Sequence, residues 1–236
     1  MLRSIRWLGC LGGALVLVGC ADWLPPRRML VSSYTPRNVY CATNVLPPTL
    51  RRVAVLPMTQ DESGVAAEEG VANLEPMLVA ELRKRNAVEV VVVAREDLRL
   101  WTGQPLWKAE TPLPTNFFQK ISAATGCDAV LFCRLTVYRP HPPLAVGLAT
   151  KLVECPRRTV FWSVDEVFDA SSAPVVSAAE AYGAYELNLP SPQLDGSAVL
   201  LSPRRFGQYA AHAVVATLPG RELSAKAPGR SADDKR

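Results

Sequence analysis

The stretch Arg52-Val53-Ala54-Val55-Leu56-Pro57 decides the fold class, because it is a short, nearly continuous apolar run that ends at a proline. Such a run predicts a strand that is buried on both faces, as in the parallel sheets of α/β proteins. A second run, residues 88–93, consists largely of β-branched valine and predicts a second buried strand. An amphipathic helical pattern lies between the two runs. The sequence therefore predicts two parallel strands connected by a crossover helix.

The crossover helix is expected to begin at Asn73 as its N-terminal cap, with Pro76 in the first turn, where proline is tolerated. Leu74, Leu78 and other apolar residues share one face, and Asn86 suits a left-handed C-terminal position. The preceding residues, 59–70, are acidic and rich in glycine, so we expect a solvated connector. A phosphate-binding loop is excluded because the Gly-Lys-Ser/Thr ending is missing.

The remaining pattern completes a mixed α/β domain. Helices are expected at residues 95–101, at 117–125 with a stop at Gly126, and after Ser202-Pro203, which suit a cap and a first helical position. Strands are expected at residues 129–137, 144–153 and 159–169. Residues 177–185 fit a helix, and residues 196–201 fit either a loop or a short strand. The sequence thus predicts a three-layer α/β fold, a mixed sheet of about five strands with helices packed on it, as one domain over residues 49–218.

The N-terminus carries an export pattern. Arg3 and Arg6 precede an uncharged apolar run, residues 7–18, which is too short for a membrane-spanning helix of about 20 residues. The run ends in Leu17-Val18-Gly19-Cys20, which resembles the lipobox of bacterial lipoprotein precursors. The resemblance implies removal of residues 1–19 by cleavage between Gly19 and Cys20, and lipid attachment to Cys20. Ala21 stands where aspartate would resemble an inner-membrane retention signal, so the outer membrane, facing the periplasm, is favoured.

Both ends of the mature chain are expected to lie outside the domain. Residues 20–48 are rich in proline, arginine, serine and asparagine and predict an extended tether. Residues 219–236 predict a disordered polar tail. Cleavage would remove Arg3 and Arg6 and lower the formal net charge from +4 to +2. Because the chain also lacks a basic stripe, nucleic acid is excluded as a partner.

Four cysteines besides Cys20 belong to the mature chain: Cys41, Cys127, Cys133 and Cys155. An oxidising periplasm permits disulfides, and four cysteines allow three complete pairings, among which the sequence does not choose. The alternative is that they are small buried apolar residues. No zinc-type spacing is present, so we expect neither a metal site nor a cofactor.

The sequence contains no convincing catalytic group. His141 lies between two prolines, His212 lies within a helix beside alanines, and no G-x-S-x-G motif is present. Asp165, Glu166 and Asp169 raise the possibility of a paired-acid glycosidase. However, Asp165 and Glu166 are adjacent in a strand and point to opposite faces, so we expect no catalytic residue.

The turn at residues 138–143 contains three prolines that restrict its backbone. One interpretation is a rigid hairpin connection. The other is a preorganised partner contact, in which Tyr138, Arg139 and His141 present an aromatic ring, a cation and an imidazole.

Three segments together resemble a known family: residues 52–57, the stretch from Leu78 to Leu98 that ends Val92-Val93-Ala94-Arg95-Glu96-Asp97-Leu98, and Thr125-Gly126-Cys127-Asp128-Ala129-Val130-Leu131. They look like the periplasmic domain of the curli-secretion-channel (CsgG) superfamily. That superfamily includes the LpoB-like activators of penicillin-binding proteins and is similar to the N-terminal domain of TolB. The resemblance implies a lipid-tethered domain that acts by protein contact and without catalysis.

The resemblance leaves three functions open. The first is a non-enzymatic, periplasm-facing outer-membrane lipoprotein that binds other envelope proteins in an export or wall-assembly complex. The second is a homo-oligomeric secretion-pore subunit, which requires membrane strands of about 9–11 alternating residues, and only residues 179–189 offer one. The third is an enzyme that acts on glycan or peptide. We expect the first.

Overall fold

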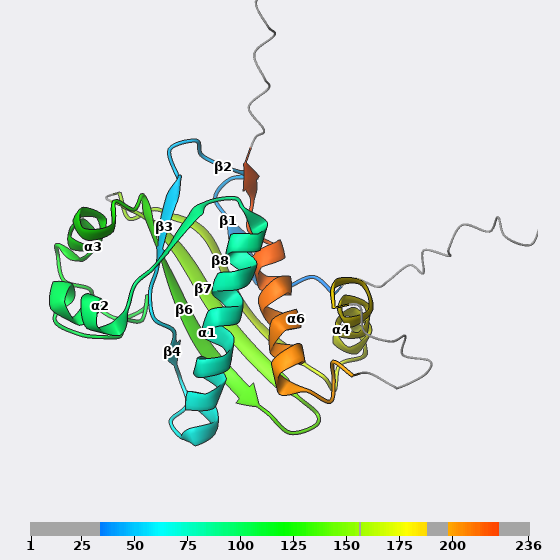
Figure 1. Cartoon of the computed structure of the whole chain (residues 1–236). Coiled ribbons are helices and arrows are strands. Elements are labelled where there is room, and N and C mark those ends of the chain that lie inside the picture. The colour runs from blue at the N-terminus through cyan, green and yellow to red at the C-terminus, as the bar shows by residue number, and fades with distance from the viewer. Residues whose placement is uncertain (1–33, 156, 188–197, 222–236) are drawn as a thin grey trace, which may run out of the picture. The chain divides into compact units, whose positions relative to one another are not determined.

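The computed structural model describes residues 34–155, 157–187 and 198–221. It confirms the expected α/β class: helices pack on an open mixed sheet (Figure 1). The strands are β1 (Val39–Cys41), β2 (Val45–Leu46), β3 (Arg52–Val55), β4 (Thr59–Gln60), β5 (Glu89–Val92), β6 (Ala129–Arg139), β7 (Ala145–Glu154), β8 (Val160–Asp169) and β9 (Gly220–Arg221). The helices are α1 (Val65–Arg85), α2 (Arg95–Thr102), α3 (Phe117–Thr125), α4 (Ala173–Glu186) and α6 (Pro203–Ala216).

The main sheet has the order β1-β8-β7-β6-β3-β5. As expected, β3 is parallel to β5 and to β6, whereas β6, β7 and β8 form an antiparallel meander. The five predicted strands are therefore present. Two short strands, β1 and β4, bring the sheet to seven, with β4 continuing the direction of β3 along β6.

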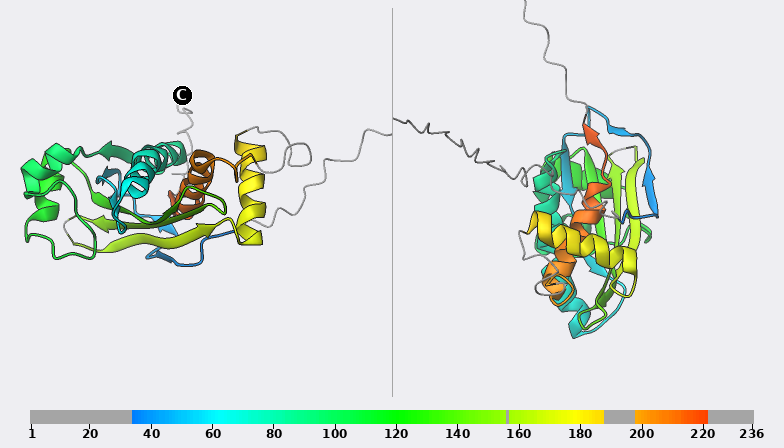
Figure 2. Two further views of the ribbon diagram at one scale, coloured as in Figure 1. Left: turned by 90° about the horizontal axis from the view of Figure 1, so that it is seen from below. Right: turned by 90° about the vertical axis from the view of Figure 1, so that its right-hand side faces the viewer.

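One face of the sheet is covered by α1 and α6, which lie side by side across it (Figures 1 and 2). The apolar side chains between these helices and the sheet form the larger buried cluster of the domain. Its bulkiest members are fully buried: Trp162, Phe168 and Phe206. Gly70 lets α1 approach β6 closely, since a Cβ there would lie 2.7 Å from the Tyr138 ring. The apolar cluster on this face is consequently continuous.

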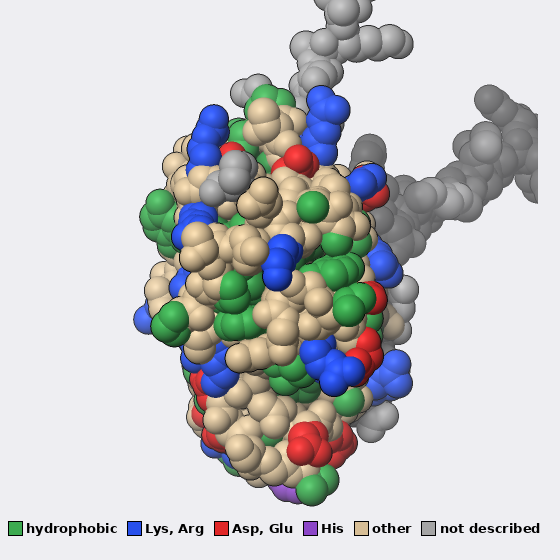
Figure 3. Space-filling view, turned by 90° about the vertical axis from the view of Figure 1, so that its left-hand side faces the viewer, with side chains coloured by type: hydrophobic (Ala, Val, Ile, Leu, Met, Phe, Trp, Pro, Cys, Tyr) green, Lys and Arg blue, Asp and Glu red, His purple; other side chains and the backbone are tan. Residues whose placement is uncertain are grey.

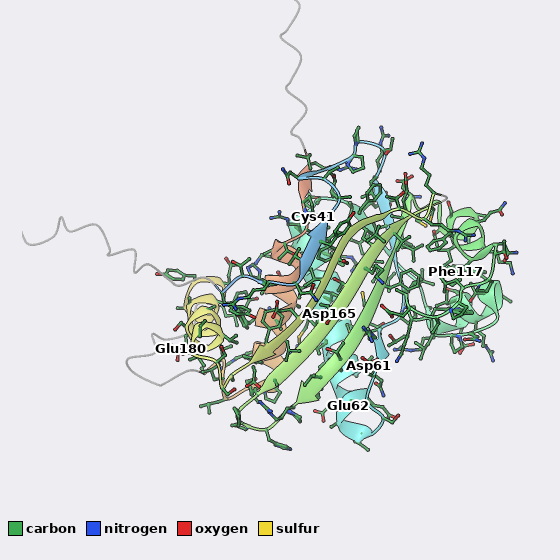
Figure 4. All side chains as sticks on the ribbon, turned by 180° about the vertical axis from the view of Figure 1, so that it is seen from behind. Cys41, Asp61, Glu62, Phe117, Asp165 and Glu180 are labelled. Atoms are coloured by element: carbon green, nitrogen blue, oxygen red, sulfur yellow. The ribbon has the colours of Figure 1, made fainter. Side chains whose placement is uncertain are left out.

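The opposite face is covered only at one end, by the lobe that contains α2 and α3. Phe117, Phe132 and Trp107 form the aromatic centre of the smaller cluster, and the Phe117 ring stacks on Phe132 at 5.9 Å between centroids. Seen from behind, the strands at the other end of this face lie in front, with no described helix across them (Figure 4). We call this part, formed by the outward side chains of β6, β7 and β8, the open half of the sheet.

Helix α1 begins earlier than expected, at Val65 after Gly64. Asn73 is therefore not a cap, and Pro76 lies inside the helix rather than in its first turn. A proline there removes one helical hydrogen bond. The helix nevertheless continues because Val71, Leu74 and other residues on both sides of the proline are buried against the sheet. Tertiary packing thus outweighs a local signal.

The described part of the expected tether, residues 34–48, belongs to the domain, which corrects the predicted boundary. β1 pairs with β8, so it covers what would otherwise be an open edge. The Glu166 carboxylate holds the segment before β1, because it accepts hydrogen bonds from the Tyr34 hydroxyl at 2.8 Å and the Arg37 amide at 2.6 Å.

The domain also extends beyond its predicted C-terminal boundary at residue 218. β9, at the start of the expected tail, pairs in parallel with β2 in a separate two-stranded sheet. The predicted signal segment with Gly19 and Cys20, the first part of the tether and the rest of the tail lie outside the described residues.

Helix α4 confirms the helix expected at residues 177–185, with Val175, Ala179 and Tyr182 buried. The amphipathic strand considered for residues 179–189 is wrong as far as Glu186, because α4 occupies those positions, and residues beyond 187 lie outside the described range. Turns, not a strand, occupy residues 198–201. None of the described helices combines the length and apolarity needed to cross a bilayer.

Candidate functional site

The open half of the sheet carries polar side chains because strand residues alternate between faces. Cys133 and Leu135 of β6 point toward α1, so Arg134 between them points outward. Its neighbours on this face include Lys151 of β7 and Asp165 of β8. Figure 4 shows Asp165 on this uncovered face.

Five side chains on and beside this surface form what we call the charged network: Asp61, Lys108, Glu110, Arg134 and Lys151. The Asp61 carboxylate pairs with Lys108 Nζ at 2.8 Å and with Arg134 Nη1 at 2.9 Å. Glu110 lies 3.4 Å from Lys151 Nζ and 4.0 Å from Arg134 Nη2. The loop after α2 thus supplies two members, the strands supply two, and residue 61 after β4 joins them.

The network controls the ionisation of Asp61. Partial burial opposes the charged form, but hydrogen bonds from Lys108 and Arg134 and the positive charge of both groups outweigh it. The pKa of Asp61 therefore lies below the ordinary aspartate value. These groups are partly exposed charges of both signs that pair with one another.

Two hollows adjoin the network. The smaller, about 170 Å³, is lined by Lys108, Glu110, Arg134, Lys151 and Asp165 among others, and it is smaller than the roughly 300–1,000 Å³ usual for small-molecule sites. The larger, about 860 Å³, lies between α1 and the loop after α2 and includes the Glu75–Arg95 ion pair at 3.0 Å. The Glu75 carboxylate also accepts a hydrogen bond from the Met58 amide at 3.1 Å. Glu75 and Arg95 thus already pair with groups of the domain itself.

The turn proposed as a partner contact does not present its three residues together. Tyr138 is buried against α1, because a register shift between Leu135 and Val137 turns it toward the helices. Arg139 is exposed and binds both carboxylate oxygens of Asp169 at 3.0 Å. Tyr138 is therefore not available for the predicted partner contact. Arg139 and His141 are both exposed, and their role in such a contact remains a prediction.

The three carboxylates considered for catalysis have separate surroundings. Asp165 lines the smaller hollow, Glu166 holds the segment before β1, and Asp169 pairs with Arg139. Hydrogen bonds from Ser171 and Arg139 outweigh partial burial and lower the pKa of Asp169.

Sequence reasoning missed the surroundings of His212. Its Nδ1 lies 3.0 Å from the buried carboxylate of Glu81, and its ring lies 4.8 Å from that of Tyr182. The pair joins α6 to α1. No spacing rule connects residues 131 positions apart, so only the helix packing reveals it.

All four cysteines of the described domain are free thiols. Cys41 is exposed on β1, and Cys133 is buried in the larger cluster. Cys127 is buried in the smaller cluster, where half-buried Cys155 also packs. Across the described ranges, no three histidine, cysteine, aspartate or glutamate side chains come together as metal ligands.

The side of the domain that carries α2 and α3 shows lysine and arginine side chains scattered singly rather than gathered in a stripe (Figure 3). The charged side chains on this side thus lie singly or in local pairs.

No known protein family matches the sequence, and no curated protein does. Among solved structures, the chain is similar to the PelC dodecamer from Paraburkholderia phytofirmans, at 12% identity over 80% of this chain and 99% of that one, with a TM-score of 0.46. It is also similar to lipoprotein GNA1162 from Neisseria meningitidis, at 18% identity over 50% of this chain and 79% of that one, with a TM-score of 0.37. A further similar structure is the LpoB C-terminal domain from Escherichia coli, at 16% identity over 50% of this chain and 82% of that one, with a TM-score of 0.32.

The resemblances to LpoB, to the curli channel and to TolB that the sequence suggests remain predictions. At these scores, neither the function nor the assembly state of those proteins transfers to this chain.

Proposed function

We propose that the protein is a non-enzymatic lipoprotein of the bacterial envelope that binds other envelope proteins through the open half of the sheet. It is held at the periplasmic face of the outer membrane by lipid on Cys20. The partner belongs to an export or cell-wall assembly complex. The observation that carries this proposal is the charged network, an ordered set of charges on a surface that no described helix covers.

The geometry of this surface suits a protein partner. The network has three cations and two carboxylates, and most of these charges pair with one another, so they are fixed in position before a partner arrives. Fixed charges of both signs favour a partner surface of complementary pattern and disfavour others. Rigid strands also place a contact surface more accurately than loops do.

The anchor rests on the sequence alone. The lipobox-like residues Leu17 to Cys20 support lipid attachment, and they precede the domain by only a short segment. A domain held at a membrane and presenting an ordered polar surface is well placed to recruit other proteins there.

Crosslinking in native envelopes, followed by mass spectrometry, tests the binding. The double variant Lys151→Glu/Arg134→Glu should lose the crosslinked partner, because it reverses two cations of the network. Lys120→Glu, which reverses an exposed cation on α3, is the matched control and should keep it. A partner captured equally by all three proteins, at peptides remote from β6 and β7, would place binding elsewhere.

Membrane fractionation tests the anchor separately. The unaltered chain should sediment with the outer membrane, and Cys20→Ser should abolish lipid labelling. Lipid labelling that survives in Cys20→Ser would contradict the assignment of Cys20.

A further inference from the structure

Cys127 and Cys155 lie close together, because the fold brings the start of β6 beside the end of β7. The backbone N–H of Cys155 donates to the carbonyl oxygen of Asp128 at 2.8 Å, so residue 155 lies directly beside the residue that follows Cys127. Both side chains belong to the smaller apolar cluster. Each thiol is the largest influence on the pKa of the other, so the two sulfurs lie close together.

The other pairings are geometrically excluded. A disulfide requires Cα atoms within about 7 Å. Cys133 lies six residues beyond Cys127 in the direction of β6, about 20 Å away, and its partner in the register is Thr150, five residues and about 16 Å from Cys155. Cys133 also points to the opposite face.

Cys41 is too far from all three. It pairs with Trp162 of β8, so even the nearest part of β7 is two strand spacings, about 10 Å, away. Of the three complete pairings that four cysteines allow, none is therefore reachable as a whole. Only the bond between Cys127 and Cys155 is.

The two thiols differ in access. Cys127 is buried, whereas Cys155 lines a surface hollow of about 480 Å³ together with Phe118, Ser122 and Arg158. A small oxidant can enter this hollow and meet Cys155 first. Cys127 then lies behind it, within reach of its sulfur.

We propose that Cys127 and Cys155 are a redox pair that forms an intramolecular disulfide, with Cys155 as the entry thiol and Cys127 as the resolving thiol. The bond fastens the residue after β7 to the second residue after α3. It requires no other cysteine and does not depend on the lipid anchor.

The electrostatics favour a reactive pair, in which the charge lies on Cys127 beside the accessible Cys155. The pKa of Cys127 is lowered to about 7, chiefly by the hydrogen bond from Cys155, and that of Cys155 is raised correspondingly. Because the two groups share a proton, the easy first ionisation belongs to the pair rather than to one sulfur. One thiolate is thus present near neutral pH, and it is the form that reacts with disulfides.

The reaction balances with a small-molecule disulfide as the oxidant. Cys155 passes its proton to the Cys127 thiolate as its sulfur attacks one oxidant sulfur, so that a mixed disulfide forms and one thiol is released after protonation. Cys127 then loses its proton and attacks the Cys155 sulfur, which releases the second thiol. The two protein thiols lose two electrons and two protons in total, and the oxidant disulfide is reduced to two thiols.

Glutathione disulfide tests the proposal on the purified, reduced, folded chain. After treatment, maleimide should label Cys41 directly and Cys133 only after denaturation, whereas Cys127 and Cys155 should resist labelling until a reductant is added. Peptide mapping should recover one crosslinked peptide that joins residues 127 and 155. The proposal is overturned if both cysteines stay labelable after treatment and denaturation, or if either is joined to Cys41 or Cys133.

Single variants test the order of the two thiols. Cys127→Ser should trap glutathione on Cys155, because the resolving thiol is missing. Cys155→Ser should give a much slower adduct, since buried Cys127 is poorly reached. Cys41→Ser and Cys133→Ala are the matched controls and should form the crosslinked peptide as the unaltered chain does. Equal adduct rates in the two serine variants would overturn the assigned order.

Discussion

The two faces of the sheet differ in how their side chains are stabilised. The face under α1 and α6 is largely apolar and contains the bulkiest buried residues, such as Trp162 and Phe206. The opposite face is apolar only beneath the α2–α3 lobe, and beyond it carries the charged network. The same strands therefore support a continuous core on one side and two distinct regions on the other.

This difference separates the apolar packing that stabilises the domain from the surface that we propose binds a partner. Burial of apolar area provides most of the folding free energy, so changes under α1 and α6 should affect the whole domain. Half-exposed ion pairs contribute little to stability, typically below about 1 kcal/mol. The network can thus be altered without unfolding the domain. The following predictions test the contrast, from the largest effect to the smallest.

Trp162→Ala should have the largest effect. The side chain is fully buried, and its indole N–H donates to the Thr217 hydroxyl at 3.0 Å. Removing a buried tryptophan leaves a cavity, and we expect a loss of about 4–5 kcal/mol in the free energy of unfolding. Urea denaturation measures it. Trp162→Phe should lose less, and a loss of less than about 2 kcal/mol for the alanine variant would contradict a continuous core.

Phe117→Ala should destabilise the smaller cluster by about 3–4 kcal/mol. Phe117 is fully buried and contacts the rings of Trp107, Phe118 and Phe132. Because this cluster is separate from the larger one, amide hydrogen exchange should accelerate in α2 and α3 more than in α1 and α6. Uniform acceleration in all four helices would show that the two faces are one cooperative unit.

Gly147→Ala should cost about 1–3 kcal/mol through overpacking. A Cβ at this position of β7 would collide with the Thr136 hydroxyl and lie 2.9 Å from the Val137 backbone nitrogen. Adding Thr136→Ala should recover part of the loss, which a double-mutant cycle in urea measures. If the double variant lost the sum of both effects, the collision would not be the cause.

Asp61→Asn should have the smallest effect and should appear mainly as a change in pH dependence. The folded-state pKa of Asp61 is below its ordinary value, so the charged form stabilises the fold at neutral pH. That contribution is lost as pH falls below about 4 through the folded-state pKa. The variant should therefore lose less stability on acidification than the unaltered chain. Glu62→Gln, an exposed neighbour, is the control and should leave the acid profile unchanged.

Local sequence signals were sufficient where a single residue type determines the backbone. Asn86 and Gly126 end their helices in the left-handed conformation, and the Ser202 side chain accepts a hydrogen bond from the Arg205 amide, all as predicted. The five apolar strands β3, β5, β6, β7 and β8 were also predictable. The early start of α1 was not, because residues 65–70 have the composition of a loop and become helical through burial of Ala67 and Gly70.

The candidate site was less predictable than the fold. Arg134 alternates outward from β6 as the pattern allows, but its partner Asp61 comes from a segment expected to be a solvated connector. β1 could not be predicted for a similar reason: three residues, Val39–Cys41, form a strand only because β8 offers an unpaired edge. Such features depend on distant segments that meet only in the folded chain.

The hydrogen bonds to the Glu166 carboxylate are the first contacts of the domain that a pulling force from the N-terminal side would meet. Tension applied from the N-terminal side enters at Tyr34 and meets the bonds from Tyr34 and Arg37 to Glu166 before it reaches β1. If those bonds and the three residue pairs of β1 are pulled away, the edge of β8 from Trp162 to Val164 becomes free, while α1 and α6 stay packed. A domain pulled from its N-terminal side would thus expose a free edge of β8, able to accept a strand from another chain.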